Sequence, residues 1–358
     1  WPLVIADSES PASLDAMCAR TQVICTTVGP YLRYGENLVV AAASAGTDYV
    51  DLTGEVPFSR FTIDKTDELA RSTGARIVNS CGFDSVPSDL GTYLLYRTAA
   101  AAGAGTLGDT TMVVASMRGG ASGGTIDSMR VIAEQAGDPG TRRLLLNPQA
   151  LSGGPGDIPH AGPRDAPSDI APVSAKTVDP ALRGTLAPFF MSSYNTRVVR
   201  RSDVLLDDAY GPDFRYRETM AVGGVPVLSA AIAGAVSVGT GIGLGLMGFG
   251  PTRKLLDRVL PKPGEGPSEK AREAGHFTTH TYTTTSSGRR FRSQIRAQGD
   301  PGYKATAVML GEAALSLALD RDKLPDRAGA LTPAAAMGDV LIERLQGAGF
   351  EIDVVELT

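Results

Sequence analysis

The chain has 358 residues, of which 42% are hydrophobic and 20% are charged, and its formal net charge is −5 at pH 7. This length suits two domains better than one core, and the acidic balance excludes the basic footprint by which proteins bind nucleic acid. The three cysteines (Cys18, Cys25 and Cys81) form no CxxC pair, which argues against a zinc knuckle or a disulfide framework and indicates a reducing, cytoplasmic compartment.

Strands and helices alternate over the first hundred residues. Apolar or β-branched runs predict strands at 3–6, 22–28, 49–52 and 75–79. Periodic runs between them predict helices at 13–20, 36–45, 64–72 and 89–102, two of which stop at Gly46 and Gly74. Strands separated by helices of this length form βαβ units, so we expect residues 1–105 to contribute a parallel sheet of the Rossmann type.

The remainder of the chain, 106–358, predicts a second α/β domain with a mixed sheet. Patterns indicate strands at 110–117, 196–201, 214–220, 277–285, 290–297 and 350–357, and helices at 125–136, 303–319 and 333–346. The turn Ser286-Ser287-Gly288 joins two of these strands as a hairpin. Residues 147–180 are rich in proline and hold no aromatic side chain, which predicts a loop without a core of its own.

An apolar, glycine-rich segment covers residues 225–250, inside a stretch without any charged side chain. It is long enough to cross a membrane, but each glycine disfavours a helix. Three interpretations stay open: a hairpin or helix that dips into a membrane or lipid, a buried element between the domains, and a true span. The first would place the protein at the periphery of the inner membrane.

The loop after the second predicted strand is the first candidate for binding a ligand, since open parallel sheets bind ligands at the carboxyl ends of their strands. Here Gly29 would let the backbone approach a flat ring closely, and Pro30 fixes the path of the chain. Thr27 and Val28 precede them, and Tyr31 offers a hydroxyl or a stacking face. The alternative interpretation is an ordinary turn between a strand and a helix.

The next strand ends at the same edge, and polar residues follow it. Asp51 and Glu55 could each accept a hydrogen bond from a ribose or a substrate, with Gly54 between them. The alternative is that Asp51 or Thr53 only caps a turn.

A third segment, residues 80–91, again leads from a strand into a helix. Asp84, Ser85, Ser88 and Asp89 are all residues that cap helices well, although one helix needs only one cap. This surplus suggests that some of these side chains face a ligand.

The histidines do not predict a metal site. His276 and His280 are four residues apart, which on a strand places them ~13 Å apart at ~3.3 Å per residue. His160 lies in the proline-rich loop. No histidine-based metal site or hydrolase triad is therefore expected.

Five stretches together resemble one known family: TTVGPYLRYGENLVVAAASAGTDYVDLTGE, CGFDSVPSDLG, SGGT, PKPGEGPS and LTPAAAMGDVLIERL. They resemble the saccharopine dehydrogenase-like oxidoreductases, and among these most closely the trans-acting enoyl reductases of phthiocerol and phenolphthiocerol lipid biosynthesis. In that family a glycine-rich dinucleotide-binding element comes before the residue that corresponds to Trp1. No such element opens a βαβ unit here, so we expect an N-terminally truncated chain with an incomplete Rossmann domain.

The resemblance implies an NADPH- or NADH-dependent oxidoreductase. Val28-Gly29-Pro30-Tyr31 would lie beside the nicotinamide half of the cofactor, with Thr27 next to them, and Gly54 and Glu55 would line the same cleft. Tyr31 and Asp84 are the candidate proton donors. The implied reaction is reduction of a C=C bond in a lipid-like or carrier-bound acyl chain, with a polyketide synthase as partner.

Two alternatives differ from this in kind. An imine reductase acting on amino acids would need a cluster of arginines for carboxylates, for which Arg33 and Arg118 are available. A non-catalytic protein of the same fold would bind a membrane or lipid through residues 225–250 and would have no affinity for the cofactor.

Overall fold

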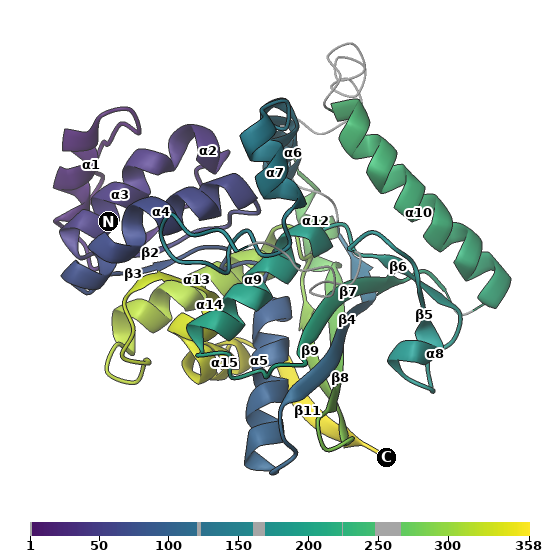
Figure 1. The fold of residues 1–358 in the computed structure, drawn as a ribbon. Coiled ribbons are helices and arrows are strands. Elements are labelled where there is room, and N and C mark those ends of the chain that lie inside the picture. The colour runs from purple at the N-terminus through teal and green to yellow at the C-terminus, as the bar shows by residue number, and fades with distance from the viewer. Residues whose placement is uncertain (1, 120–122, 160–168, 224, 248–265) are drawn as a thin grey trace.

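Two sheets form the α/β fold of the computed structural model, which describes residues 2–358 except 120–122, 160–168, 224 and 248–265. The first is a four-stranded sheet in the order β1-β2-β3-β10, with every pair parallel. The second is a seven-stranded sheet in the order β11-β9-β8-β4-β7-β6-β5 (Figure 1). Its β4–β7 pair is parallel and its other pairs are antiparallel, so the predicted mixed sheet is confirmed.

The first sheet takes three strands from the start of the chain and one from near its end. Its strands are β1 (Val23–Cys25), β2 (Asp48–Val50), β3 (Arg76–Val78) and β10 (Gly329–Leu331), and its helices are α1 (Pro11–Cys18), α2 (Tyr31–Tyr34), α3 (Glu36–Ala45) and α4 (Val56–Thr73). Gly46 and Gly74 end α3 and α4 in the left-handed conformation, as predicted. The boundary near residue 105 stays a prediction: the second sheet begins with β4, but β10 returns to the first.

The strand predicted at residues 3–6 is wrong. These residues form no strand, and Leu3 and Ile5 are 97% and 98% exposed. A strand needs a hydrogen-bonded neighbour, and β1 of the described sheet pairs only with β2.

The second sheet packs one face against helix α5 (Val86–Ala101). Its strands are β4 (Leu107–Arg118), β5 (Val173–Ser174), β6 (Thr185–Pro188), β7 (Arg215–Ala221), β8 (His276–Thr285), β9 (Arg290–Gln298) and β11 (Glu351–Leu357). The predicted hairpin is confirmed, since β8 and β9 pair residue by residue around Gly288, whose φ is 81°. Phe277, Phe291 and Ile295 point from this hairpin into the core.

The remaining helices contain two corrections. They are α6 (Gly123–Gln135), α7 (Pro139–Leu146), α8 (Ala175–Val178), α9 (Ser192–Leu205), α10 (Pro226–Met247), α12 (Glu269–Glu273), α13 (Lys304–Leu319), α14 (Pro333–Ala336) and α15 (Gly338–Gly347). The strand predicted at 196–201 is wrong, because these residues lie inside α9. The single helix predicted at 333–346 is two helices, which are separated at Met337. The second helix begins at Gly338, whose φ is 42°.

Buried arginines of α9 hold the start of the proline-rich segment. Arg197 donates to the carbonyls of Leu145 and Asn147, at 2.7 and 3.0 Å. Arg201 donates to the carbonyl of Leu151 at 2.8 Å. In the helix the two side chains lie one turn apart on the same face. Part of the predicted 147–180 loop forms β5 and α8, and its residues 160–168, with His160, lie outside the described residues.

The apolar segment forms helix α10, which lies along the outside of the molecule (Figure 1). Ser229 and Ala233 are buried, whereas Val227 and Leu228 are 83% and 57% exposed. The interpretation as a buried element between domains is therefore wrong for this part of the helix. Among the described residues, no helix is both long and apolar enough to be a candidate for crossing a membrane. Residues 248–250 lie outside the described residues.

Candidate active site

Three loops meet at the carboxyl ends of β1, β2 and β3. They cover residues 26–31, 51–55 and 79–85, so the three segments selected from the sequence lie at one edge of the first sheet. Parallel strands place their carboxyl ends together, and this edge is where open sheets bind ligands.

The loop after β1 presents its backbone to solvent. Thr27, Val28 and Gly29 are exposed, Val28 by 56%, whereas Pro30 is buried behind them. The amide of Val28 donates to the Thr26 hydroxyl at 3.2 Å, which holds the turn. The exposed residues of this loop are therefore next to a buried proline, Pro30. Contact between the loop and a cofactor stays a prediction.

Glu55 joins this loop to the next one. Its carboxylate is fully buried and accepts hydrogen bonds from the amides of Tyr31 and Leu32, at 3.0 and 2.9 Å. It also accepts one from the Ser128 hydroxyl of α6 at 2.7 Å. Beside it, a Cβ on Gly54 would lie 3.2 Å from the methyl of a methionine at the start of α9. Both oxygens of Glu55 thus support the shape of the loop.

Tyr31 is buried, and its hydroxyl has two backbone partners. It donates to the Thr26 carbonyl at 3.2 Å and accepts from the Leu52 amide at 3.1 Å. Burial raises the pKa of Tyr31 well above its usual range, with further contributions from the charges of Asp51 and Asp84. The hydroxyl would have to leave these partners in order to give up its proton.

Asp51 ties the ends of β2 and β3 together. One carboxylate oxygen accepts from the amides of Thr53 and Ser80, at 3.0 and 2.8 Å, and the other from the side chains of Tyr49 and Asn79, at 3.1 and 2.8 Å. The residue is fully buried, and burial raises its pKa to about 6. These contacts favour the turn-capping interpretation of Asp51.

Asp84 differs from Asp51 and Glu55 at this edge, because no described side chain hydrogen-bonds to its carboxyl group. It is partly buried in the loop after β3, and no hydrogen bond from another side chain reaches it among the described residues. Burial raises its pKa to about 7, with a further contribution from Asp51. A carboxyl group with a pKa near neutrality holds a proton that it can transfer.

The other capping residues of this segment face the interior. The Ser85 hydroxyl donates to Asn195 at 3.2 Å, and Ser88 accepts from the same amide at 3.3 Å. Asp89 accepts from Ser202 and from the amide of Ala334. The surplus of capping residues therefore joins α5 to α9 and α14, and the suggestion that Ser85, Ser88 and Asp89 face a ligand is wrong.

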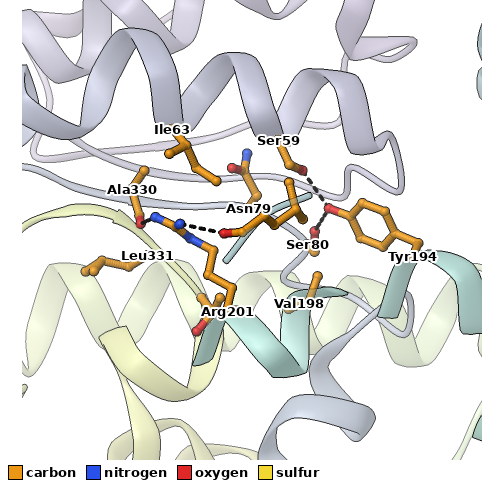
Figure 2. A pocket seen from close by; sticks show the side chains of 11 residues that line it. Ser59, Ile63, Asn79, Ser80, Tyr194, Val198, Arg201, Ala330 and Leu331 are labelled. Carbon is orange, nitrogen blue, oxygen red and sulfur yellow. Dashed lines mark hydrogen bonds between the residues drawn. The ribbon is translucent and has the colours of Figure 1, made fainter. Parts of the chain in front are cut away.

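A small cavity lies behind these loops (Figure 2). Its volume is about 10 Å³, enough for about one water molecule. Figure 2 shows the Tyr194 hydroxyl between those of Ser59 and Ser80, at 2.8 and 2.5 Å. Tyr194 could not be found from the sequence because the following residues of α9 look like a strand. Asn79, Arg201 and Thr332 are among the other lining residues.

The structure also places the side chains that were considered for a metal site or for binding carboxylates. No group of three or more histidine, cysteine, aspartate or glutamate side chains among the described residues could hold a metal ion. His280, on β8, shares a hydrogen bond with Gln294 at 3.0 Å. Arg33 forms an ion pair with Glu134 at 3.1 Å, and Arg118 is exposed at the end of β4.

Comparison with known proteins decides the family. The chain is 52% identical over 366 residues to a Mycobacterium tuberculosis protein provisionally named a trans-acting enoyl reductase, covering all of this chain and 85% of that protein. It is 47% identical over 368 residues to the trans-acting enoyl reductase of Mycobacterium bovis, covering all of this chain and 86% of that protein. The chain belongs to the trans-acting enoyl reductase family. It is therefore an oxidoreductase that acts on CH–CH groups, and the family implies a nicotinamide cofactor.

The solved structures show the fold of this enoyl reductase. Saccharopine dehydrogenase (L-Glu forming) from Saccharomyces cerevisiae superimposes with a TM-score of 0.50, covering 98% of this chain and 88% of the yeast chain, at 14% identity. The saccharopine dehydrogenase-like fold expected from the motifs is thus confirmed. No protein-family model matches the chain.

Proposed function

We propose that this enoyl reductase uses NADPH to reduce the C=C bond of an acyl or polyketide chain carried on a synthase. The observation that supports this most is the pairing of two features at one edge of the sheet. The exposed backbone of residues 27–29 and the unpartnered carboxyl of Asp84 both lie where a parallel sheet binds ligands.

The residues of this edge fit the nicotinamide half of the cofactor. Exposed Thr27, Val28 and Gly29 leave backbone free to approach a flat ring, and Glu55 holds the loop from behind. When bound, the cofactor supplies the hydride. The chain has no glycine-rich turn opening a βαβ unit, so these residues account only for the nicotinamide side.

Asp84 is the better candidate for the proton donor. Hydride addition to an enoyl thioester leaves an enolate, which needs a proton at carbon. With a pKa of about 7, Asp84 is protonated in part of the molecules at neutral pH, and no other side chain among the described residues competes for that proton. Tyr31, whose hydroxyl binds two backbone groups, would serve to hold the loop in place.

The test is NADPH oxidation by the full gene product, followed by absorbance, with an enoyl thioester on a carrier protein. We expect oxidation with this substrate, whether the cofactor supplied is NADPH or NADH. An amino acid mixed with an aldehyde, which forms an imine, is the matched control, because Arg33, one of the two arginines available for a carboxylate, is already paired with Glu134. Oxidation with the imine alone, or with neither substrate, would contradict the proposal.

The exposed face of α10 fits contact with a lipid-like chain or membrane surface, which would place the enzyme at the periphery of the inner membrane. In its first two turns Val227, Leu228 and Ile232 are exposed, whereas Ser229 and Ala233 are buried. We expect a triple glutamine variant to lose about a thousandfold or more in binding to phospholipid vesicles, since burying each such side chain contributes roughly 1.5–3 kcal/mol and each ~1.4 kcal/mol is tenfold. The residues changed are Val227, Leu228 and Ile232.

A triple glutamine variant elsewhere on the surface is the control for this measurement. It changes side chains of similar exposure on α13 and β11, namely Leu315, Leu319 and Val355. Equal vesicle binding by both variants and the unchanged protein, measured by co-sedimentation, would refute the role of α10.

A further inference from the structure

The loop that carries Asp84 is held firmly on the side of β3. Gly82 has no room for a side chain, because a Cβ there would lie 2.6 Å from the Leu52 methyl. The Phe83 amide donates to the Thr306 hydroxyl at 2.9 Å. Asp84 itself has no partner side chain among the described residues, so its orientation depends on the residues that follow it.

Asn195 of α9 holds the first turn of α5 directly after Asp84. Its side chain is fully buried. The amide oxygen accepts from the Ser85 hydroxyl at 3.2 Å, and the amide nitrogen donates to the Ser88 hydroxyl at 3.3 Å. The side-chain amide of Asn195 thus hydrogen-bonds to two hydroxyls in the turn that begins next to Asp84.

Glu218 of β7 determines which way this amide faces. It is 2% exposed, and one of its oxygens accepts from the Asn195 nitrogen at 2.9 Å while the other accepts from the Tyr216 hydroxyl at 2.9 Å. Burial raises the pKa of Glu218 to about 7, and in its ionised form the carboxylate can only accept hydrogen bonds. In that form the nitrogen of Asn195 must face Glu218, which leaves the oxygen of Asn195 for Ser85.

We propose that Asn195 and Glu218 are positioning residues, which hold Ser85 and thereby orient the Asp84 carboxyl toward the reacting edge. This inference rests on the proposed role of Asp84 and deepens it. The groups that face Asp84 from neighbouring elements are Asp51, Tyr31 and Tyr194, whose interactions with it are electrostatic. Asn195, in contrast, hydrogen-bonds to the side chain of Ser85, the residue next to Asp84.

Two variants on one helix separate positioning from mere stability. Asn195→Ala removes the hydrogen bond to Ser85. Ser202→Ala is the matched control: two turns further along α9 it removes a buried hydrogen bond to Asp89 of the same helix α5. Both changes should lower the melting temperature, because each leaves a buried polar group without a partner.

Only Asn195→Ala should act on Asp84. We expect it to lower kcat about tenfold to a hundredfold, since small misplacements of a reacting group have effects of that size. We also expect the pKa of Asp84, followed by NMR of isotope-labelled aspartate carboxyls and assigned with Asp84→Asn, to fall by about one unit as water reaches the loosened loop. Ser202→Ala should change neither quantity.

Glu218→Leu provides a second route if Asn195→Ala does not fold. Leucine fills much of the same space but offers no oxygen to the Asn195 nitrogen, so the same shift of the Asp84 pKa is expected. An unchanged Asp84 pKa in the folded variants would overturn the inference. The NMR titration does not need turnover, so a protein that shows this shift but reduces no enoyl thioester would refute the proposed function alone.

Discussion

Replacing Asp84 with asparagine should lower kcat about 10²–10³-fold, because a positioned general acid typically contributes an effect of that size. Asparagine keeps the shape of the side chain but has no acidic proton. In the proposed mechanism the protonated form of Asp84 is the active one. With a pKa of about 7 for Asp84, kcat/KM should fall as pH rises above about 7, and the variant should lose this limb of the profile.

The same variant should gain stability at neutral and alkaline pH. The folded-state pKa of Asp84 lies above its usual value of 3.8, so the stability that the protonated group contributes is fully present below that value. It is lost as pH rises through about 7, where the buried group must ionise. Asparagine does not ionise, so the melting temperature of the variant should exceed that of the unchanged protein above pH 7.

The exposed Asp353→Asn, on β11, is the control for these measurements. It makes the same chemical change far from the edge of the first sheet and should alter neither kcat nor the pH profile. An Asp84→Asn enzyme with full kcat, or with an unchanged alkaline limb, would remove Asp84 from the reaction.

Replacing Asp51 with alanine should lower the free energy of unfolding by about 4 kcal/mol, because each buried donor left without its acceptor costs about 1–3 kcal/mol. The change leaves the amides of Thr53 and Ser80 and the side chains of Tyr49 and Asn79 without that acceptor. Since these groups join the loops after β2 and β3, binding of NADPH should weaken as well.

Urea unfolding of three proteins measures this effect: the unchanged chain, Asp51→Ala and Asp51→Asn. Asparagine keeps one oxygen and can satisfy two of the four donors, so it should lose about half as much stability as alanine. A loss below about 1 kcal/mol in Asp51→Ala would show that water replaces the carboxylate, which a fully buried site should not permit.

Local patterns were enough to predict much of the architecture. Gly46 and Gly74 end helices because only glycine adopts the left-handed conformation there readily, and this is readable in one dimension. The β8–β9 hairpin follows from period-two alternation around a tight turn. The three loops of the candidate site could be placed at one edge because strands in βαβ units run parallel.

Other features depend on contacts between distant residues. Arg197 and Arg201 of α9 donate to carbonyls at the end of α7 and in the segment after it, and a local run of valines and arginines does not show these distant contacts. One of the two neighbours of β3 is β10, more than two hundred residues later in the chain.

The sequence by itself therefore determined the family, the parallel sheet and the edge at which Tyr31, Glu55 and Asp84 lie. Only the tertiary structure decided their roles. Glu55 is buried against two amides and Tyr31 against two backbone groups, while Asp84 keeps a carboxyl without a partner side chain among the described residues. The physical reason is that a side chain's chemistry depends on its hydrogen-bond partners and burial, and Asn195 and Glu218 come from elements far along the chain.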